Sequence, residues 1–409
     1  MPLLMPCEDL QPGMQLNETF MFRGRVMLSG KKILTRSDVD VLRRQYPDTT
    51  LKVSDPIFYS LTEFENDARD RDVTACVTHQ IRLIMADVRR KFGQHTNLSG
   101  IDFPRIKNAV ASVVEFLRNN PESTAQISRT ASTPGYPSKH AGNVFYLSML
   151  LGAAVQDYLL HERQRHLLNT LASLLAIDLK PLGLGAMFFD VAMAQVPHFF
   201  DEQYQLTAAD FQYIREHPRT GEEMLPDTLP PLAKLVVRGH HETYDGTGYP
   251  GSWPMEQQHV FVRIVRICDA FDAATSRKFF RAAKSPTRAL WEMSYGPYRN
   301  YYDPTLVKVF LSIIQPFPIG TVLTLEDGYG AVVTKYNHES PFTPWAVVMF
   351  DPYGERLTED ELLGPRTVGE GFLKIKRAGM EDLSFLNEAP PELAERPRAF
   401  SNFMETAYP

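Results

Sequence analysis

The chain has 409 residues, of which 44% are hydrophobic and 22% are charged, and these proportions exclude a disordered or fibrous protein. The formal net charge of −6 leaves no broad basic surface, so we expect no binding to duplex nucleic acid. Three widely spaced cysteines form no CxxC pair, which favours a reducing compartment and therefore a cytoplasmic protein.

Residues 1–65 have the pattern of a small accessory module with short strands, turns and one helix. Two short apolar runs flank Arg23-Gly24-Arg25 and predict a hairpin. Thr35 is the expected N-cap of the helix, with Asp38 in its first turn. The apolar stretches of the chain are too short and too interrupted to cross a bilayer, so we expect no membrane span.

Residues 66–315 have a helical pattern, with apolar residues spaced at three and four positions. We divide this region into entry helices with a linker, residues 66–135, and a central helical domain, residues 136–315. The linker is expected because residues 120–137 are rich in Ser, Thr and Pro.

After residue 315 the pattern changes to short β-type runs separated by turn residues. It predicts a small β-barrel-like module over residues 316–380. Residues 381–409 include a charged, proline-rich stretch and are expected to form a loosely ordered tail. The predicted fold class is mainly α, with a helical bundle core and small β-rich modules at both ends.

The most informative segment is His240-His241-Glu242-Thr243-Tyr244-Asp245-Gly246-Thr247-Gly248-Tyr249-Pro250. Adjacent histidines at the end of a helix can bind two neighbouring metal ions, because their imidazoles leave different sides of the backbone. An isolated pair of histidines is weak evidence for a metal site. The eleven-residue pattern is far more specific.

This segment resembles the HHExxDGxGYP signature of the HD-GYP family at every fixed position. Three further elements resemble that family in the same order: His140 at the start of a helix, His217-Pro218 with Gly221, and Asp269 to Ser276. Together they cover roughly residues 136–312. The resemblance implies an HD-type helical bundle around two or three metal ions, and hydrolysis of the phosphodiester bonds of cyclic-di-GMP.

The resemblance also implies which residues form the site. The implied metal ligands are His140, Asp190, His217, His240, His241 and Asp269, and Asp190 is also the implied catalytic residue. The metal would be iron or manganese, as is usual in the family, although this donor set also suits zinc. For the dinucleotide we expect contacts from Lys278, Arg281, Arg277, Gly248, Tyr249 and Pro250.

Two residues depart from the family's LLHDIGK element, in which Asp190 keeps the aspartate. Phe189 stands where the family has histidine, and a phenyl ring cannot coordinate a metal ion. Met193 stands where the family has lysine, and a thioether carries no positive charge. We therefore expect a metal site that holds fewer ions, or holds them less tightly.

Two functions remain open at this point. In the first, the chain is a degenerate HD-GYP protein that binds cyclic-di-GMP, or partners such as diguanylate cyclases or PilZ-type proteins, with weak or no hydrolysis. The alternative is an active metal-dependent cyclic-di-GMP phosphodiesterase with an incomplete ligand set. We favour the first, because Phe189 and Met193 replace two polar residues of the family element within one helical turn. Whether the chain is an enzyme stays undecided.

Simpler structural roles also remain open for several of these residues. Asp190 alone could be a helix-terminal carboxylate, and His140 alone a polar residue at a helix start. The basic run from Arg277 to Arg281 could be a solvated helix face. The Phe188-Phe189 pair is expected to pack in the core, filling the space of the missing imidazole.

Overall fold

The computed structural model describes a discontinuous set of residues: 3–7, 10, 14–22, 24–47, 49–54, 104, 106–108, 110–111, 114, 136–166, 178–196, 207–276, 283–358, 361–362, 365–369, 373–379 and 381–387. The basic run from Arg277 to Arg281, most of the expected linker and residues 388–409 of the expected tail lie outside this set.

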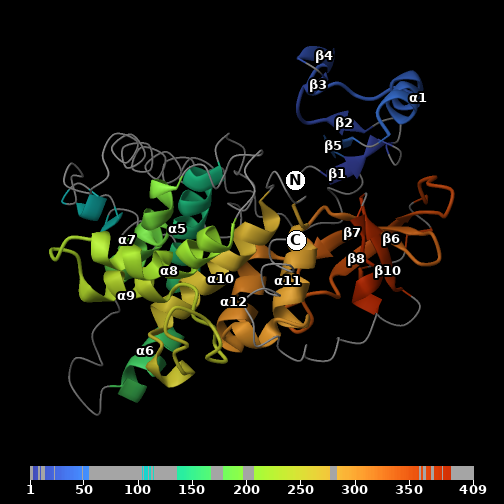
Figure 1. Cartoon of the computed structure of the whole chain (residues 1–409). Coiled ribbons are helices and arrows are strands. Elements are labelled where there is room, and N and C mark those ends of the chain that lie inside the picture. The colour runs from blue at the N-terminus through green and yellow to red at the C-terminus, as the bar shows by residue number, and fades with distance from the viewer. Residues whose placement is uncertain are drawn as a thin grey trace. The chain divides into compact units, whose positions relative to one another are not determined.

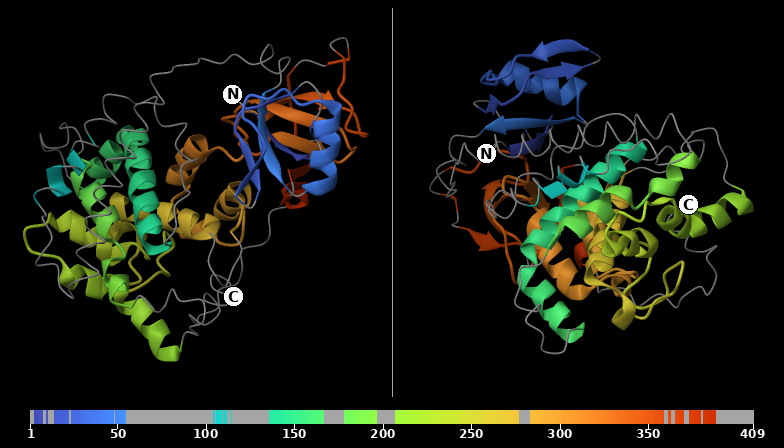
Figure 2. Two further views of the ribbon diagram at one scale, coloured as in Figure 1. Left: turned by 90° about the horizontal axis from the view of Figure 1, so that it is seen from above. Right: turned by 90° about the vertical axis from the view of Figure 1, so that its left-hand side faces the viewer.

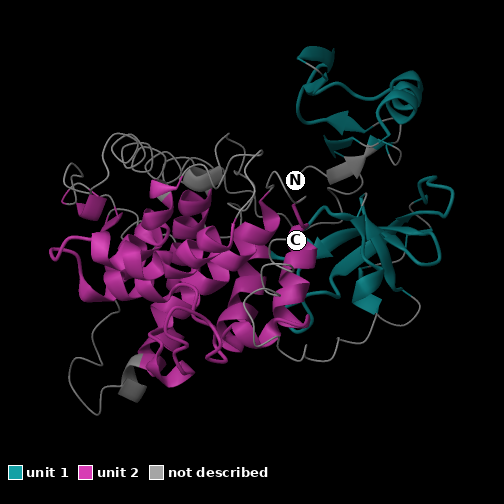
Figure 3. Cartoon of the chain, in the orientation of Figure 1, with its two compact units in different colours: residues 1–66, 315–390 teal, residues 67–314, 391–409 magenta. Residues whose placement is uncertain are grey.

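The chain divides into two compact units, which Figure 3 distinguishes by colour. The first comprises residues 1–66 and 315–390, and the second comprises residues 67–314 and 391–409. The two β-rich segments, which the sequence analysis treats as separate modules, thus belong to one unit.

The second unit is helical. Figure 1 labels its helices along the chain: α5 (Tyr136–Ala154), α6 (Gln156–His166), α7 (Lys180–Phe188), α8 (Ala208–Met224), α9 (Pro231–Gly239), α10 (Val260–Thr275), α11 (Pro286–Ser294) and α12 (Pro304–Ile314). Short 3-10 helices include η5 (Val191–Gln195), η7 (Met255–Gln257) and η8 (Arg299–Tyr301). Helix α5 packs against α7, α10 and α12, and α9 packs against α7, α8 and α10, so the helices form the bundle seen in both views of Figure 2.

Close packing of α7 on α9 brings the end of α7 to the end of α9. A Cβ atom on Gly185 would lie 2.5 Å from the Cβ of Val236, closer than two such atoms can approach. Glycine at this position therefore allows the two helices to touch. As a result, Asp190, directly after α7, and His240, directly after α9, lie near each other.

The first unit contains short antiparallel sheets and one helix. Strands β1 (Leu3–Pro6), β5 (Thr50–Ser54) and β2 (Gln15–Leu16) form one sheet, and β3 (Phe20–Phe22) pairs with β4 (Arg25–Leu28). This pairing confirms the predicted hairpin. Helix α1 (Arg36–Gln45) begins at Thr35, whose side chain accepts from the Asp38 amide, so the predicted N-cap is also confirmed.

The C-terminal part of this unit is a six-stranded antiparallel sheet. Its strands run in the order β11-β10-β6-β7-β8-β9, with these bounds: β6 (Val322–Leu325), β7 (Gly330–Lys335), β8 (Trp345–Phe350), β9 (Arg366–Thr367), β10 (Ile375–Ala378) and β11 (Glu381–Asp382). The 3-10 helix η9 (Ser384–Asn387) follows. The mainly α fold class, with β-rich segments near both ends, is confirmed.

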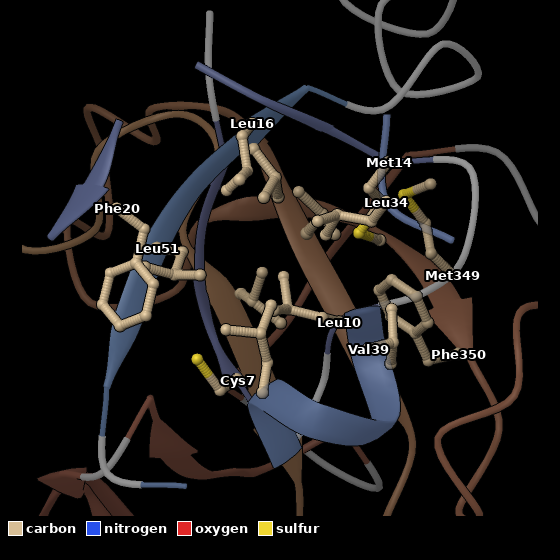
Figure 4. Close-up of a cluster of buried hydrophobic side chains, with 14 of the residues drawn as sticks. Cys7, Leu10, Met14, Leu16, Phe20, Leu34, Val39, Leu51, Met349 and Phe350 are labelled. Atoms are coloured by element: carbon tan, nitrogen blue, oxygen red, sulfur yellow. The ribbon is translucent and has the colours of Figure 1, made fainter. Parts of the chain in front are cut away.

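One hydrophobic core joins the two segments of this unit. Leu34 and Val39 from the N-terminal part pack in the same buried cluster as Val332, Met349 and Phe350 from the C-terminal sheet. Figure 4 shows several of these side chains pointing toward one another from both segments. Burial of apolar surface therefore holds the two distant segments together.

Among the helices that the structure describes, no single one is both long and apolar enough to cross a membrane.

Candidate metal centre

Six predicted ligands, carried by five segments of the helical unit, form one cluster. His140 lies on α5, Asp190 between α7 and η5, His217 on α8, and Asp269 on α10, while His240 and His241 directly follow α9. The shortest contacts that link them are between 3.0 and 3.9 Å. The fold thus brings together side chains that are up to 129 positions apart in sequence.

Four of the six are close enough to bind one metal ion together. One ligand atom from each of Asp190, His217, His240 and His241 lies within 4.8 Å of the other three. Atoms that bind the same ion at about 2.0–2.2 Å lie at most about 4.4 Å apart, so only a small contraction is needed. Three imidazoles and a carboxylate suit iron, manganese or zinc.

The tautomer of His217 follows from the proline after it. In an α-helix the amide of residue 218 would donate to the carbonyl of Ile214, but Pro218 has no N–H. Instead, Nδ1–H of His217 donates to this carbonyl oxygen. Its Nε2 atom is therefore the unprotonated one in the neutral ring and carries a lone pair.

His240 has the same tautomer for a related reason. It caps the C-terminal end of α9, where the last carbonyl groups lack helical donors. Its Nδ1–H donates to the carbonyl oxygen of Val237 at 2.7 Å, so Nε2 is the nitrogen that is left to bind a metal ion.

The two Nε2 atoms face each other. Nε2 of His217 lies 3.1 Å from Nε2 of His240, and it lies 3.2 Å from Oδ1 of Asp190. Three acceptor atoms at these distances repel one another unless a proton or a metal cation lies among them. The donor set therefore fits a bound metal ion.

The acid–base state of two cluster members also suits metal binding. The pKa of the His241 imidazole is held well below its ordinary value by burial and by the charges of neighbouring residues, so the ring is neutral. Burial alone would raise the pKa of the Asp190 carboxyl, but contacts with His217 and His240 hold this pKa well below its ordinary value. Asp190 is thus an ionised carboxylate.

His140 and Asp269 lie beside this group but bond mainly to each other. Nε2 of His140 lies 3.0 Å from Oδ1 of Asp269, and its Nδ1 lies 2.7 Å from Oδ2 of Asp272. Burial alone would lower the pKa of His140, yet these two carboxylates raise it to about 10. The ring is thus an imidazolium that donates from both nitrogens, and Asn143 holds Asp272 from the other side, at 2.6 Å.

Phe189 fills the space between the two parts of the cluster. Its side chain is fully buried, and its ring packs edge-on against His140 and His240, with centroids 5.4 and 5.0 Å away. The expected packing of Phe188 and Phe189 in the core is confirmed, since both are buried. A ligating imidazole at position 189 would lie between these two histidines.

The loop after the histidines is fixed by Glu242. Its buried carboxylate accepts from the amides of Gly251 and Trp253 at 2.6 and 2.9 Å. A Cβ on Gly248 would lie 2.4 Å from the carbonyl oxygen of His241, so only glycine fits there. The loop in turn places the Tyr249 ring in a stack on His241, with centroids 4.7 Å apart.

Three residues of the centre were not selected from sequence: Glu242, Asp272 and Arg266. Glu242 lies in the segment from His240 to Pro250, and Asp272 lies in the segment from Asp269 to Ser276, one turn after Asp269 on α10. Arg266 lies one turn before Asp269 on the same face of α10, so this spacing could have indicated from the sequence that Arg266 lies near the site. The predicted phosphate contacts Arg277, Lys278 and Arg281 lie outside the described residues.

Comparison with known proteins found one family that is similar to part of the helical unit. The HD domain family matches residues 158–306, which include five of the six predicted ligands, all except His140, together with Phe189. This part of the helical unit is thus similar to an HD domain. The match falls within the helical unit and includes none of the β-rich unit.

Curated relatives also match part of the chain. Cyclic di-GMP phosphodiesterase PA4108 of Pseudomonas aeruginosa is 30% identical over 171 residues, 41% of this chain and 41% of that protein. The cyclic di-GMP phosphodiesterase response regulator RpfG of Xanthomonas campestris is 27% identical over 37% of this chain and 41% of that protein. The 3'3'-cGAMP-specific phosphodiesterase 2 of Vibrio cholerae is 26% identical over 39% of this chain and 31% of that protein. The matched region thus spans less than half the length of each relative.

Proposed function

We propose that the chain is a metal-dependent phosphodiesterase that hydrolyses a cyclic dinucleotide, with cyclic-di-GMP as the first candidate. The observation that carries this proposal is the convergence of the Nε2 atoms of His217 and His240, 3.1 Å apart, beside an ionised Asp190, because a metal ion or a shared proton must lie among three such atoms and this donor set suits a metal ion. The similarity to cyclic di-GMP phosphodiesterases supports the choice of substrate.

We further propose that one metal ion binds at Asp190, His217, His240 and His241. A bound ion would lower the pKa of its water and neutralise charge on the phosphate. The ligand roles predicted for His140 and Asp269 would require His140 to lose a proton, because in the described geometry it bonds to Asp269 and Asp272. These roles stay predictions.

The protein's own residues would act on the substrate in three ways. Asp190 holds the ligating histidines in place, since its Oδ1 contacts both His217 and His240. His140 keeps a proton on Nε2, 3.9 Å from Oδ2 of Asp190, and supplies positive charge near the phosphate. Tyr249, stacked on His241, offers an aromatic wall for a base or ribose.

The base specificity stays open between two substrates. Relatives include enzymes named for cyclic di-GMP and for 3'3'-cGAMP, which differ in one base. Both dinucleotides present the same phosphodiester groups to a metal centre.

A second candidate function is binding without turnover. It is favoured by one specific observation: Phe189 is fully buried between His140 and His240, where a ligating side chain would otherwise lie. In that case the chain would bind cyclic-di-GMP, or a diguanylate cyclase or PilZ-type protein, and would not hydrolyse the dinucleotide.

Paired measurements on the full chain distinguish these functions. Protein purified without added metal is analysed for its elements, and product formation is followed with cyclic-di-GMP and 3'3'-cGAMP. We expect about one ion per chain and turnover of at least one dinucleotide, and both are lost in Asp190→Asn. Tight binding of the dinucleotide without product would instead support the second function.

A further inference from the structure

Arg266 is a buried cation for which the described residues provide no hydrogen bond. It lies on α10, one turn before Asp269, and only 7% of the residue is exposed. Its Nη1 lies 3.6 Å from Oδ2 of Asp269, beyond hydrogen-bond distance, and its Nε is enclosed without a partner. A buried guanidinium without hydrogen bonds is costly, so the position calls for an explanation.

Arg263 shows how the same helix treats a purely structural arginine. It lies one turn earlier and is also buried, but its terminal nitrogens donate to Glu162, Asp303 and Tyr158. The chain thus supplies partners for a buried guanidinium where its role is structural. For Arg266, the described residues provide the distant carboxylate of Asp269, the Tyr302 ring, whose centroid lies 5.6 Å away, and electrostatic contacts with Tyr249 and Tyr301, but no hydrogen bond.

The ion pair with Asp269 does not use the hydrogen-bond donors of Arg266, because the closest nitrogen and oxygen are 3.6 Å apart. Oδ1 of Asp269 already bonds to the His140 imidazolium at 3.0 Å. A group that accepts hydrogen bonds and carries negative charge would suit Arg266, and such a group would lie beside the metal-binding group, since Nδ1 of His241 is 3.7 Å from the same Asp269 oxygen that Arg266 approaches. A phosphodiester group meets each of these requirements, because its two non-bridging oxygens match the planar fork of a guanidinium.

We propose that Arg266 binds a non-bridging phosphate oxygen of the substrate beside the metal-binding group. This inference rests on the proposed function and deepens it, because it names the side chain that receives the scissile phosphate. Arg266 also supplies a positive charge near the site, whereas Met193 on η5 supplies none. A charge held close to the reacting phosphate stabilises the transition state as well as the bound substrate.

The test compares Arg266→Met, Arg266→Lys and the control Arg288→Met in the full chain. Arg288, on α11, forms a surface ion pair with Glu292 at 2.9 Å, so its replacement changes the net charge equally without touching the site. Calorimetry measures binding of inorganic phosphate and of cyclic-di-GMP to metal-loaded and chelator-treated protein. Elemental analysis and thermal melting are recorded for each variant.

We expect Arg266→Met to weaken phosphate and dinucleotide binding about 10- to 100-fold, with unchanged metal content. Arg266→Lys keeps the positive charge but loses the two parallel N–H donors of the guanidinium, so we expect this variant to retain part of the affinity. Its binding of phosphate also tests the proposal if Arg266→Met does not fold. Arg288→Met should bind like the natural chain.

The outcomes separate this inference from the proposed function. If the natural chain binds phosphate through Arg266 but hydrolyses neither dinucleotide, the inference stands and the proposed function fails. If hydrolysis is present and the Arg266 variants bind phosphate like the natural chain, the inference alone fails. Loss of metal or a lower melting temperature in both variants, with unchanged phosphate affinity, would assign Arg266 to the support of Asp269 and overturn the proposal.

Discussion

The ring of Phe189 packs edge-on against the imidazole of His240, with centroids 5.0 Å apart and planes at 82°. The same ring packs against His140, with centroids 5.4 Å apart, so Phe189 contacts both the four-residue metal group and the His140 and Asp269 pair. An apolar ring at this point excludes a hydrated cation from the space between the two histidines.

Restoring polar groups there should enlarge the metal centre. We predict that Phe189→His with Met193→Lys increases bound metal from about one ion toward two, because a new imidazole would lie between His140 and His240. Elemental analysis and cyclic-di-GMP turnover measure the effect. The neighbouring substitution Phe188→His serves as the control and should destabilise the core without gain of metal. Equal metal content and equal turnover in natural and double-variant protein would contradict this prediction.

Metal binding should stabilise the chain through His217. Because an ion binds the folded site and only weakly the unfolded chain, added Mn²⁺ at about 100 times its dissociation constant should contribute about 2.7 kcal/mol. We predict that the melting temperature rises with Mn²⁺ in the natural chain and not in His217→Gln. His161 is exposed on α6, so His161→Gln should respond like the natural chain. A response of His217→Gln equal to that of the natural chain would remove this residue from the ligand set.

The loop that carries Tyr249 should depend on the charge of Glu242. We predict that Glu242→Gln costs about 1–3 kcal/mol of unfolding free energy, because a carboxamide places a donor where two backbone amides require acceptors. Chemical denaturation gives the magnitude, and the exposed Glu223 provides the control Glu223→Gln, which should have little effect. A Glu242→Gln protein as stable as this control would show that the loop is held by other contacts.

The shared core of the β-rich unit makes a prediction about both of its segments. Leu34 is buried and Ile33 beside it is 62% exposed. We predict that Leu34→Ala costs about 2–5 kcal/mol and also speeds hydrogen exchange in strands β7 and β8, whereas Ile33→Ala changes stability by about 0.5 kcal/mol or less. Faster exchange confined to the N-terminal strands would mean that the two segments are stabilised separately.

Local patterns in the sequence determined much of this protein. The helical spacing, the turn residues around Gly24, and the Thr35 cap depend on interactions between residues a few positions apart, and the structure confirms the hairpin and the cap. The six ligand candidates could be named because each belongs to a short motif. Their close approach to one another agrees with that choice, although their roles in metal binding await measurement.

Only the tertiary structure decided how these residues are paired. The division into a four-residue group and a bonded His140 and Asp269 pair depends on the packing of α5, α7 and α10, which are distant in sequence. The same holds for the core that joins residues near 34 to residues near 349. Burial and hydrogen bonding across such distances set the charge of His140. The same packing left Arg266 without a hydrogen bond among the described residues. A local sequence pattern contains neither piece of information, because both depend on residues that are far apart in the chain.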